Sequence, residues 1–505
     1  MEVAMDGMME MDKFGCGFAI DGELGWSSWS PGIDWEYFPA ADDFHGLIES
    51  MISDGADRGG YGLPEFCDGS VTVSASSTNT PNTPTEELAT VGTVDDEMGL
   101  RLVHLLIAAA EALTGVQKCP ELAHVILARL KELLARGGES SMERLAAYFT
   151  DALQGLLDGG RQQEDPPPNP GELLKAFHLL QGMSPCVKFG YLTANQAIVE
   201  AVTDQRRVHI VDYDIAEGAQ WASLMQALVT RKDGQSPPLP PPHLRITAVT
   251  RCGAGRRSVA TIHDTGRRLA AFAASVGLSF SFGQCRLDSD EQFRPAAVKL
   301  FKGEALVLNC VINPPHLPRR SAVSVRSFLA SAPSLGARLV TVVEEERGGG
   351  KGDEGRGFVG LFMAELQRYS AIWDSLEARF PMQGRARGVV DRLIMGPRIT
   401  EAVETAYRRR EEGSVALEGW GKWLEAVGFG RVVLSFFNLC QAKLLLGLFD
   451  DGYRVEEEAP NKLVLCWKNC SLLSVSVWSA PPPSPPSPSP SPSPSEASFP
   501  KHSSI

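Results

Sequence analysis

The residues best suited to chemistry follow a short apolar run near the middle of the chain. The run covers residues 208–211, and Asp212, Asp214 and Gly218 come directly after it. Residues 221–229 then carry apolar side chains at helical spacing, so the segment is predicted to be strand, turn and helix. Because ligands of open α/β sheets bind beyond the carboxyl ends of the strands, these two acids and this glycine lie where a nucleotide cofactor would be held.

The same turn lacks the features that a nucleotide cofactor needs. A dehydrogenase or a methyltransferase uses several glycines in this turn and an acid at the end of the second strand. Here Gly218 is the one glycine, bulky Tyr213 and Ile215 stand where small residues are wanted, and the second strand ends at Thr250 followed by Arg251. We therefore predict a cofactor-type sheet that binds no cofactor and has no catalytic residue.

Other catalytic patterns are incomplete. The loop at residues 348–352 resembles a phosphate loop, but Glu345 occupies its first glycine position and a serine or threonine is missing after its lysine. His209 lies inside a predicted strand among apolar residues, which favours a hydrogen-bonded core histidine over a general base. Cys466 and Cys470 are spaced CxxxC with no histidine beside them, so we expect reduced thiols and no metal site.

The elements around this turn predict a doubly wound, mostly parallel α/β sheet. Apolar runs at residues 208–211, 244–250, 278–282, 305–310 and 337–343 are the expected parallel strands. Later strands are expected at residues 432–437, 463–468 and 472–478, where they close one sheet edge, and later helices at residues 358–380 and 413–428. Before the sheet, helical patterns begin after residue 96 and continue at residues 120–136, 142–157, 171–181 and 192–202.

These patterns divide the chain into three parts. Residues 1–95 form an acidic arm that is expected to be disordered, because 18 acids face only Lys13 and Arg58 and give a net charge of −16. Residues 96–480 form the folded domain, with a helical cap over about residues 98–204 and an α/β core over about 205–480. Residues 481–505 form a disordered tail of proline and serine.

The charge of the folded part limits its partners. Outside the arm, 46 basic and 44 acidic residues leave a net charge of +2, so no strong basic face is expected to bind DNA by itself. No apolar run approaches the roughly 18 residues of a membrane helix, and the start of the chain lacks the pattern of a signal peptide. We expect an intracellular protein without membrane association.

The cap is rich in leucine. One predicted helix, at residues 120–136, carries the apolar stripe Leu122, Val125, Ile126, Leu130 and Leu133. Three segments match LxxLL, a motif that can place its leucines in a partner's groove. The first contains Leu102, Leu105 and Leu106; the second contains Leu130, Leu133 and Leu134; the third contains Leu153, Leu156 and Leu157. Core packing is the more common origin of such a pattern, but three in succession also indicate a surface for oligomerisation.

With these residues identified, the chain resembles the GRAS family of plant transcriptional regulators over about residues 96–480. Helices over residues 100–190 and elements over residues 276–343 are similar to its two leucine-rich regions. Its VHIID core is matched by Val208, His209, Ile210, Val211, Asp212, Asp214, Gly218, Gln220 and Trp221. Its PFYRE region is matched by residues 358–381 and 396–399 with Arg398, and its SAW region by Trp420, Gly428, Trp467 and Trp478.

Residues 99–106, 395–399 and 440–449 further resemble a branch of that family that acts in root symbiosis. Two features depart from the family: Gly396-Pro-Arg398 replaces an Arg-Glu pair, and a proline and serine tail follows Ala480. The resemblance implies a nuclear regulator with a methyltransferase-like core, joined through its leucine-rich regions to a second GRAS protein that contacts promoter DNA. The branch acts in nodulation and mycorrhizal signalling and influences strigolactone biosynthesis.

Two other functions remain open from the residues. A small-molecule-binding protein or S-adenosylmethionine-dependent methyltransferase would hold its ligand against Asp212, Asp214 and Gly218. A protein that binds DNA directly would use a basic cluster made by Arg251, Arg256, Arg257, Arg267 and Arg268.

Overall fold

The computed structural model describes most of the chain after residue 86. The described residues are 87–114, 118–136, 140–159, 169–230, 240–250, 256–287, 289–317, 319–346, 357–379, 384–412 and 419–482. The chain divides into two units, Met1–Arg101 and Leu102–Ile505, and the packing described below is that of the second. Residues 1–86 of the expected acidic arm and residues 483–505 of the expected tail lie outside the described residues.

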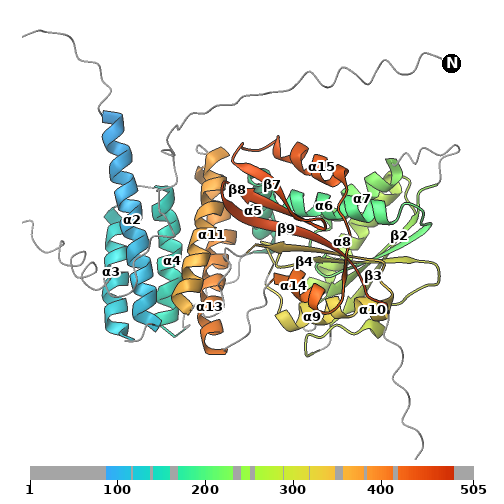
Figure 1. Cartoon of the computed structure of the whole chain (residues 1–505), viewed down its shortest axis with the longest axis horizontal. Helices are drawn as coiled ribbons and strands as arrows, with labels where there is room; N and C mark the ends of the chain where they lie inside the picture. Colours follow the sequence, from blue (N-terminus) through green and yellow to red (C-terminus); the bar gives the residue numbers. More distant parts are fainter. Residues whose placement is uncertain are drawn as a thin grey trace, which may run out of the picture. The chain divides into compact units, whose positions relative to one another are not determined.

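A nine-stranded sheet with the order β3-β2-β1-β4-β5-β9-β8-β7, with β6 beside β9, is the centre of the α/β part of this unit (Figure 1). Its parallel part contains β1 (Arg207–Asp212), β2 (His243–Thr250), β3 (Phe280–Arg286), β4 (Ala305–Val311) and β5 (Leu339–Glu345). Antiparallel to β5 follow β9 (Cys470–Ser479), β8 (Lys462–Trp467) and β7 (Tyr453–Ala459), and the short β6 (Gly430–Arg431) pairs with β9. All five predicted parallel strands are confirmed, and the last two predicted strands, β8 and β9, extend the sheet on the side of β5.

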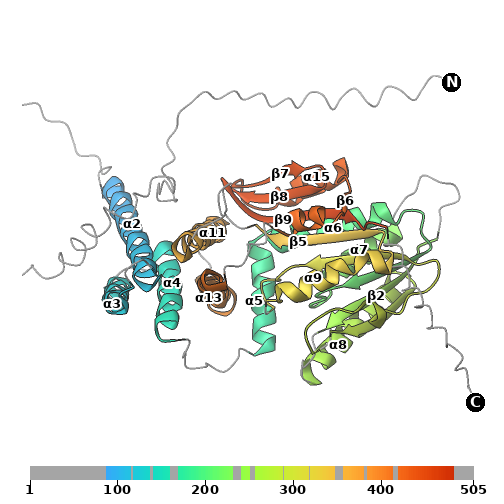
Figure 2. The ribbon, with the colours of Figure 1, turned by 60° about the horizontal axis from the view of Figure 1, so that its bottom comes forward.

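Both faces of the sheet are covered by helices, which is why its central parallel strands are mostly apolar (Figure 2). One core lies between the sheet and α6 (Cys186–Ala201), α7 (Ala219–Thr230), α8 (Arg256–Ser275) and α15 (Phe436–Leu446). The other lies between the sheet and α9 (Ala322–Ala330), α10 (Ala332–Leu335) and α14 (Gly419–Ala426). Alternate residues of β1 serve the two cores: Val208 and Ile210 pack in the first, and Val211 packs in the second.

A helical subdomain is assembled from two distant parts of the sequence. The first part is α2 (Glu87–Thr114), α3 (Pro120–Arg136) and α4 (Ser141–Leu157), and the second is α11 (Phe358–Arg379) and α13 (Gly396–Glu412). Helix α4 packs against α3, α11 and α13. The Leu102–Thr114 part of α2 lies beside α3 and α4 in Figures 1 and 2. The expected boundary near residue 204 therefore does not follow the packing, because α11 and α13 join the cap and α6 lies against the sheet.

Several helix boundaries differ from the sequence prediction. Helix α2 begins at Glu87, inside the range expected to be arm, and α5 (Pro170–Met183) and α6 begin slightly earlier than their apolar patterns. The predicted helix at 120–136 is confirmed as α3, but its stripe is rotated, since the buried residues are Ala123, Ile126, Leu127 and Leu130. Val125, expected in the stripe, is 50% exposed. Of the predicted helix at 413–428, the structure describes α14.

The predicted strand at residues 432–437 is wrong. The chain pairs with β9 at Gly430 and Arg431, and the backbone N–H of Val432 donates one more hydrogen bond to the carbonyl of Val477. Ser435 then caps α15 by accepting a hydrogen bond from the backbone N–H of Asn438. The apolar run was misread because it continues straight into an apolar helix. The edge strand β7, whose sequence is charged, was not predicted.

No helix among the described residues has the length and apolar character needed to span a bilayer.

Candidate functional site

Tyr213, in the turn between β1 and α7, and Arg320, just before α9, lie at the end of β1 where a cofactor would bind. The Tyr213 ring is fully buried and its hydroxyl donates a hydrogen bond to Ser324 Oγ on α9 at 2.7 Å. The Arg320 guanidinium lies 5.0 Å from the centre of that ring and binds Asp214, with Nε 2.9 Å from Oδ2. The space at the end of β1 is therefore filled by the protein's own side chains.

Gly218 has a packing role in this turn. Its φ of +77° lies in the left-handed region, which favours glycine. A Cβ at this position would lie 3.0 Å from Thr265 Cγ2 and 3.1 Å from Leu269 Cδ1, both on α8. The glycine thus allows α8 to approach the turn closely, which does not require a ligand.

Asp212 is the centre of a buried polar network. Its Oδ2 accepts a hydrogen bond from Trp221 Nε1 at 2.7 Å, and its Oδ1 accepts one from Asn309 Nδ2 at 3.0 Å. Asn309 exchanges hydrogen bonds of 3.2 Å with Gln220, whose Nε2 also donates to Asn195 Oδ1 at 3.2 Å. The network ties β1 to α7, β4 and α6, so these polar residues position elements of the fold.

The position of Asp212 predicts an unusual pH dependence of stability. Burial raises the pKa of Asp212 to about 7 from its ordinary value of 3.8, although its hydrogen bonds from Asn309 and Trp221 lower it. The folded state then holds this proton more tightly than the unfolded state, so Asp212's contribution to stability falls as pH rises from about 4 to about 7. We expect the free energy of unfolding, measured by urea titration, to decline more over this interval in the wild type than in Asp212→Asn. Equal pH slopes in the two proteins would contradict the prediction.

His209 is a core histidine. It is fully buried, its Nε2 lies 2.8 Å from Thr247 Oγ1, and its Nδ1 lies 3.3 Å from a carboxylate oxygen of Glu304. Burial and the charge of Arg245 lower the pKa of His209 to about 4, so the ring is neutral at physiological pH. The sequence prediction of a hydrogen-bonded core residue is confirmed.

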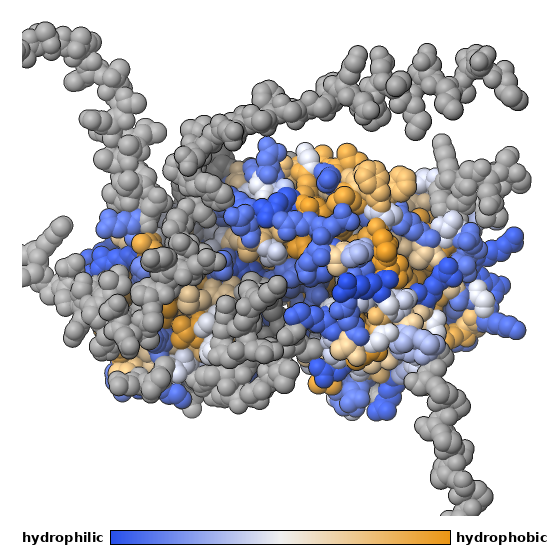
Figure 3. All heavy atoms as spheres, in the orientation of Figure 1, coloured by the Kyte–Doolittle hydropathy of each residue, from blue (hydrophilic) through white to orange (hydrophobic). Residues whose placement is uncertain are grey.

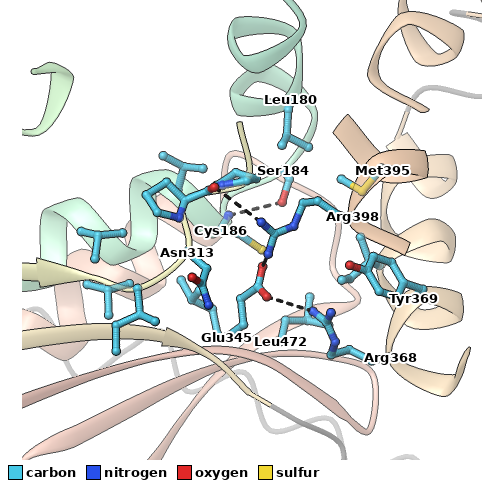
Figure 4. A pocket seen from close by; sticks show the side chains of 18 of the residues that line it. Leu180, Ser184, Cys186, Asn313, Glu345, Arg368, Tyr369, Met395, Arg398 and Leu472 are labelled. Carbon is cyan, nitrogen blue, oxygen red and sulfur yellow. Dashed lines mark hydrogen bonds and ion pairs between the residues drawn. The ribbon is translucent and has the colours of Figure 1, made fainter. Parts of the chain in front are cut away.

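A cavity of about 90 Å³ opens at the carboxyl ends of β4 and β5, and we call it the Glu345 cavity (Figure 4). The sheet, α5, α6, α11 and the start of α13 supply its walls, which are mainly apolar. Its charged side is a buried ion-pair group: Arg398 Nη2 lies 2.5 Å from Glu345 Oε1, and Arg368 Nη1 lies 3.4 Å from Glu345 Oε2. Burial alone would raise the pKa of Glu345, but Arg398, Arg368 and Arg319 outweigh it and hold this pKa at about 2.

The described residues carry no group of three or more His, Cys, Asp and Glu side chains that could hold a metal ion. Cys466 and Cys470 are free thiols. Burial raises the pKa of Cys186, which lines the Glu345 cavity, to about 11, so that thiol stays protonated and unreactive.

Comparison with known proteins identifies the family. A model of the GRAS domain family matches residues 102–479. The chain belongs to the GRAS family. Its relatives include "Protein NODULATION SIGNALING PATHWAY 2" of Lotus japonicus, 52% identical over 93% of this chain and 93% of that one, and the protein of the same name of Medicago truncatula, 51% identical over 90% and 92%. The crystal structure of SCL7 of Oryza sativa aligns with a TM-score of 0.61 at 32% identity, covering 75% of this chain and 99% of that one.

The leucines of the first leucine-rich region of this GRAS domain are mostly core residues. Leu102, Leu105, Leu106, Leu130 and Leu153 are between 0 and 1% exposed, which confirms core packing at these five positions. The remaining LxxLL leucines are half-buried: Leu133, Leu134, Leu156 and Leu157.

The motif residues of the PFYRE and SAW regions are also buried, except for Gly428, which is exposed. Arg398 binds Glu345 in the Glu345 cavity. Trp467 donates from Nε1 to Asp374 Oδ2 at 2.7 Å, and Trp478 donates to Ser476 Oγ at 2.9 Å. The backbone N–H of Trp420 donates to Glu344 Oε2 at 3.2 Å. Gly428, with a φ of +89°, forms the turn after α14.

The arginine cluster considered for direct DNA binding lies partly outside the described residues. This applies to Arg251 and to the side chains of Arg256 and Arg257. Arg267 and Arg268 are exposed on α8, where the first pairs with Asp264 and the second donates to Thr265 Oγ1 at 2.9 Å.

Sequence reasoning missed two features of this GRAS domain. One is the Glu345 cavity, whose residues come from six separate stretches of the sequence. The other is the exposed face of α15, which carries Phe436, Phe437 and Leu444. A signal for the second was present, because the segment FFNLCQAKLLL is apolar on nearly every side and a surface helix can bury only one.

Proposed function

We propose that this GRAS protein regulates transcription in nodulation signalling, acting in the nucleus in complex with a second GRAS protein at promoters. The names of its relatives support the signalling role, since both proteins cited above are called NODULATION SIGNALING PATHWAY 2. By the same resemblance the proposal extends to mycorrhizal signalling and to control of strigolactone biosynthesis.

The observation that carries a regulatory function over an enzymatic one is the filled crevice at the end of β1. Tyr213 and Arg320 take the space against the strand end, and Asp214 is engaged by Arg320. Gly218 accommodates α8. A sheet whose cofactor position at the end of β1 is occupied in this way serves as a scaffold, and regulation through other proteins is the function that a scaffold supports.

A surface for the second GRAS protein is offered by α15 and the residues beside it, which we call the α15 patch. It consists of five side chains that are 65 to 76% exposed: Val433, Phe436, Phe437, Leu444 and Leu448. Figure 3 shows apolar surface gathered over α15 at the top of the molecule. These side chains expose on the order of 600 Å², the upper end of what a monomer usually leaves in one apolar patch. With a polar rim this approaches the roughly 800 Å² that one partner contributes to a stable interface.

The charge of the domain is consistent with DNA contact mainly through the partner. Residues 96–505 carry a net charge of only +2, and α15 itself contributes Lys443 as its one charged residue. Because phosphate neutralisation supplies most of the affinity of proteins for DNA, a nearly neutral subunit gains from a partner that brings basic residues.

The alternative of a methyltransferase-like enzyme predicts binding of S-adenosylmethionine beside Asp212 and Asp214. We expect calorimetry with the full chain to show no saturable binding of S-adenosylmethionine at micromolar concentration, because Tyr213 and Arg320 occupy the position. A methyltransferase titrated in parallel serves as the positive control for binding of S-adenosylmethionine. Saturable micromolar binding would overturn the scaffold function and favour the enzyme.

The association itself is tested by pairwise binding. The full chain is titrated against a second full-length GRAS protein from the same root tissue, and binding is measured by sedimentation velocity. Complex formation that depends on the α15 patch supports the proposal, and the variants that establish this dependence are described in the Discussion.

A further inference from the structure

The Glu345 cavity has the two-sided chemistry of a ligand site. Its walls are apolar side chains from α6, β4, α11 and β9, such as Tyr191, Val311, Ile372 and Leu473. It lies beyond the carboxyl ends of β4 and β5, the edge at which open α/β sheets bind their ligands. Its volume of about 90 Å³ is several times the roughly 10–15 Å³ that a single water requires.

The polar side of the cavity offers more donors than acceptors. Arg368 and Arg398 both line it, and Glu345 is the one carboxylate that lines it. Arg398 holds Glu345 through Nη2, while its Nη1 reaches only the carbonyl of Pro314 at 3.5 Å, the limit of a hydrogen bond. An additional acceptor on a ligand would therefore find a guanidinium with spare capacity.

Tyr369 supplies an independent observation. Its side chain is 1% exposed and lines the cavity, yet its hydroxyl has no hydrogen-bond partner in the described part of the chain. In Figure 4 the hydroxyl end of Tyr369 is turned toward the cavity and the side of Arg398. Buried hydroxyls are nearly always hydrogen-bonded in folded proteins, so this donor points to an acceptor that enters the cavity.

We propose that the Glu345 cavity binds a small organic acid with an apolar body, whose carboxylate accepts hydrogen bonds from Tyr369 and Arg398. The apolar walls hold the body of the ligand, and the excess guanidinium matches its charge. The site is distinct from the filled crevice at the end of β1, and the proposal does not depend on the association of two GRAS proteins.

Other occupants fit the cavity less well. A metal ion would need several carboxylate, imidazole or thiolate ligands, whereas Glu345 is the cavity's one carboxylate and is already paired with two arginines. Water alone would leave the apolar walls unmatched, because most of the side chains that line the cavity are apolar.

The proposal is tested with benzoate and hexanoate as probes and with benzamide and hexanamide as neutral counterparts of the same shape. Binding to the full chain is followed by ligand-observed saturation-transfer NMR and by the shift of the melting temperature. We expect saturable binding of at least one acid. Its amide should bind more weakly by roughly tenfold or more, because the amide lacks the charge that pairs with Arg398. The variant Tyr369→Phe, which removes only the hydroxyl, should weaken acid binding by roughly tenfold.

Two further variants complete the test. Tyr213→Phe makes the same chemical change in the other crevice and should leave acid binding within about twofold of the wild type. Ile372→Phe adds volume inside the Glu345 cavity and should abolish binding while circular dichroism remains native. The proposal is overturned if neither acid binds, if the amides bind as tightly as the acids, or if Tyr369→Phe binds like the wild type. These outcomes need no partner protein, so they leave the proposed association unaffected.

Discussion

Replacement of Leu102, Leu105 and Leu106 by alanine is expected to unfold the GRAS domain. The three side chains are 0 to 1% exposed, and each truncation of a buried leucine costs about 2–5 kcal/mol because it removes packed methyl groups and leaves a cavity. Their sum reaches or exceeds the whole stability of a typical domain, about 5–15 kcal/mol. Loss of the cooperative thermal transition and of the native circular dichroism spectrum is the expected measurement.

The control for this triple variant is Val125→Ala on α3, a similar truncation at a position that is 50% exposed. It should leave the melting temperature nearly unchanged, since surface substitutions usually alter stability by about 0.5 kcal/mol or less. If the triple variant instead melts near the wild-type temperature and fails to bind its partner, the leucines are an interface and the core assignment is wrong.

Reversal of the chemistry of the α15 patch is expected to abolish association without affecting the fold. In Phe437→Asp combined with Leu444→Glu, two side chains that are 70 and 76% exposed become charged. Central interface residues each contribute about 2 kcal/mol or more, so affinity for the second GRAS protein should fall by roughly a hundredfold or more. The melting temperature should change little, because both positions are on the surface. Sedimentation velocity and thermal denaturation provide the two measurements.

Two exposed apolar positions outside the α15 patch serve as matched controls. Val323→Asp on α9 and Val125→Glu on α3 introduce a charge at side chains that are 57 and 50% exposed, and both variants should bind like the wild type. The Val125 variant also tests the leucine-rich helices directly. If Val125→Glu abolishes binding while the α15 double variant binds normally, the partner docks on those helices and the α15 patch has another role.

The parallel part of the sheet could be predicted from the sequence because its strands are buried on both faces. Residues 208–211 and 305–310 are apolar except for His209 and Asn309 and show no regular alternation, the pattern expected of strands covered on both faces. Residues 432–437 show the limit of this reasoning, since a short apolar run does not distinguish a strand from the start of a buried helix. In the structure, Ser435 caps α15 and so marks the start of a helix within this run. In the sequence this serine is not a sufficient signal, because serine occurs at many positions that cap no helix.

The candidate sites were predictable only where the chemistry is local. The sequence places bulky Tyr213 directly after Asp212, and in the structure its side chain is buried at the end of β1. The contribution of Arg320 was not predictable, because more than a hundred residues separate it from the tyrosine that it covers. The Glu345 cavity likewise depends on tertiary packing, which brings Tyr369 of α11 and Arg398 of α13 to the end of β5.

The split origin of the helical subdomain changes how shortened versions of this protein should be interpreted. Deleting residues 96–200 would remove α4 from α11 and α13 and would also remove α6 from the sheet. Large apolar surfaces of the remaining chain would then be exposed to solvent. Such a fragment would fail to bind its partner because it misfolds or aggregates, whether or not the removed leucines contact the partner. Mapping by deletion is therefore uninformative for this architecture, and the contact surface has to be charted by single substitutions in the intact molecule.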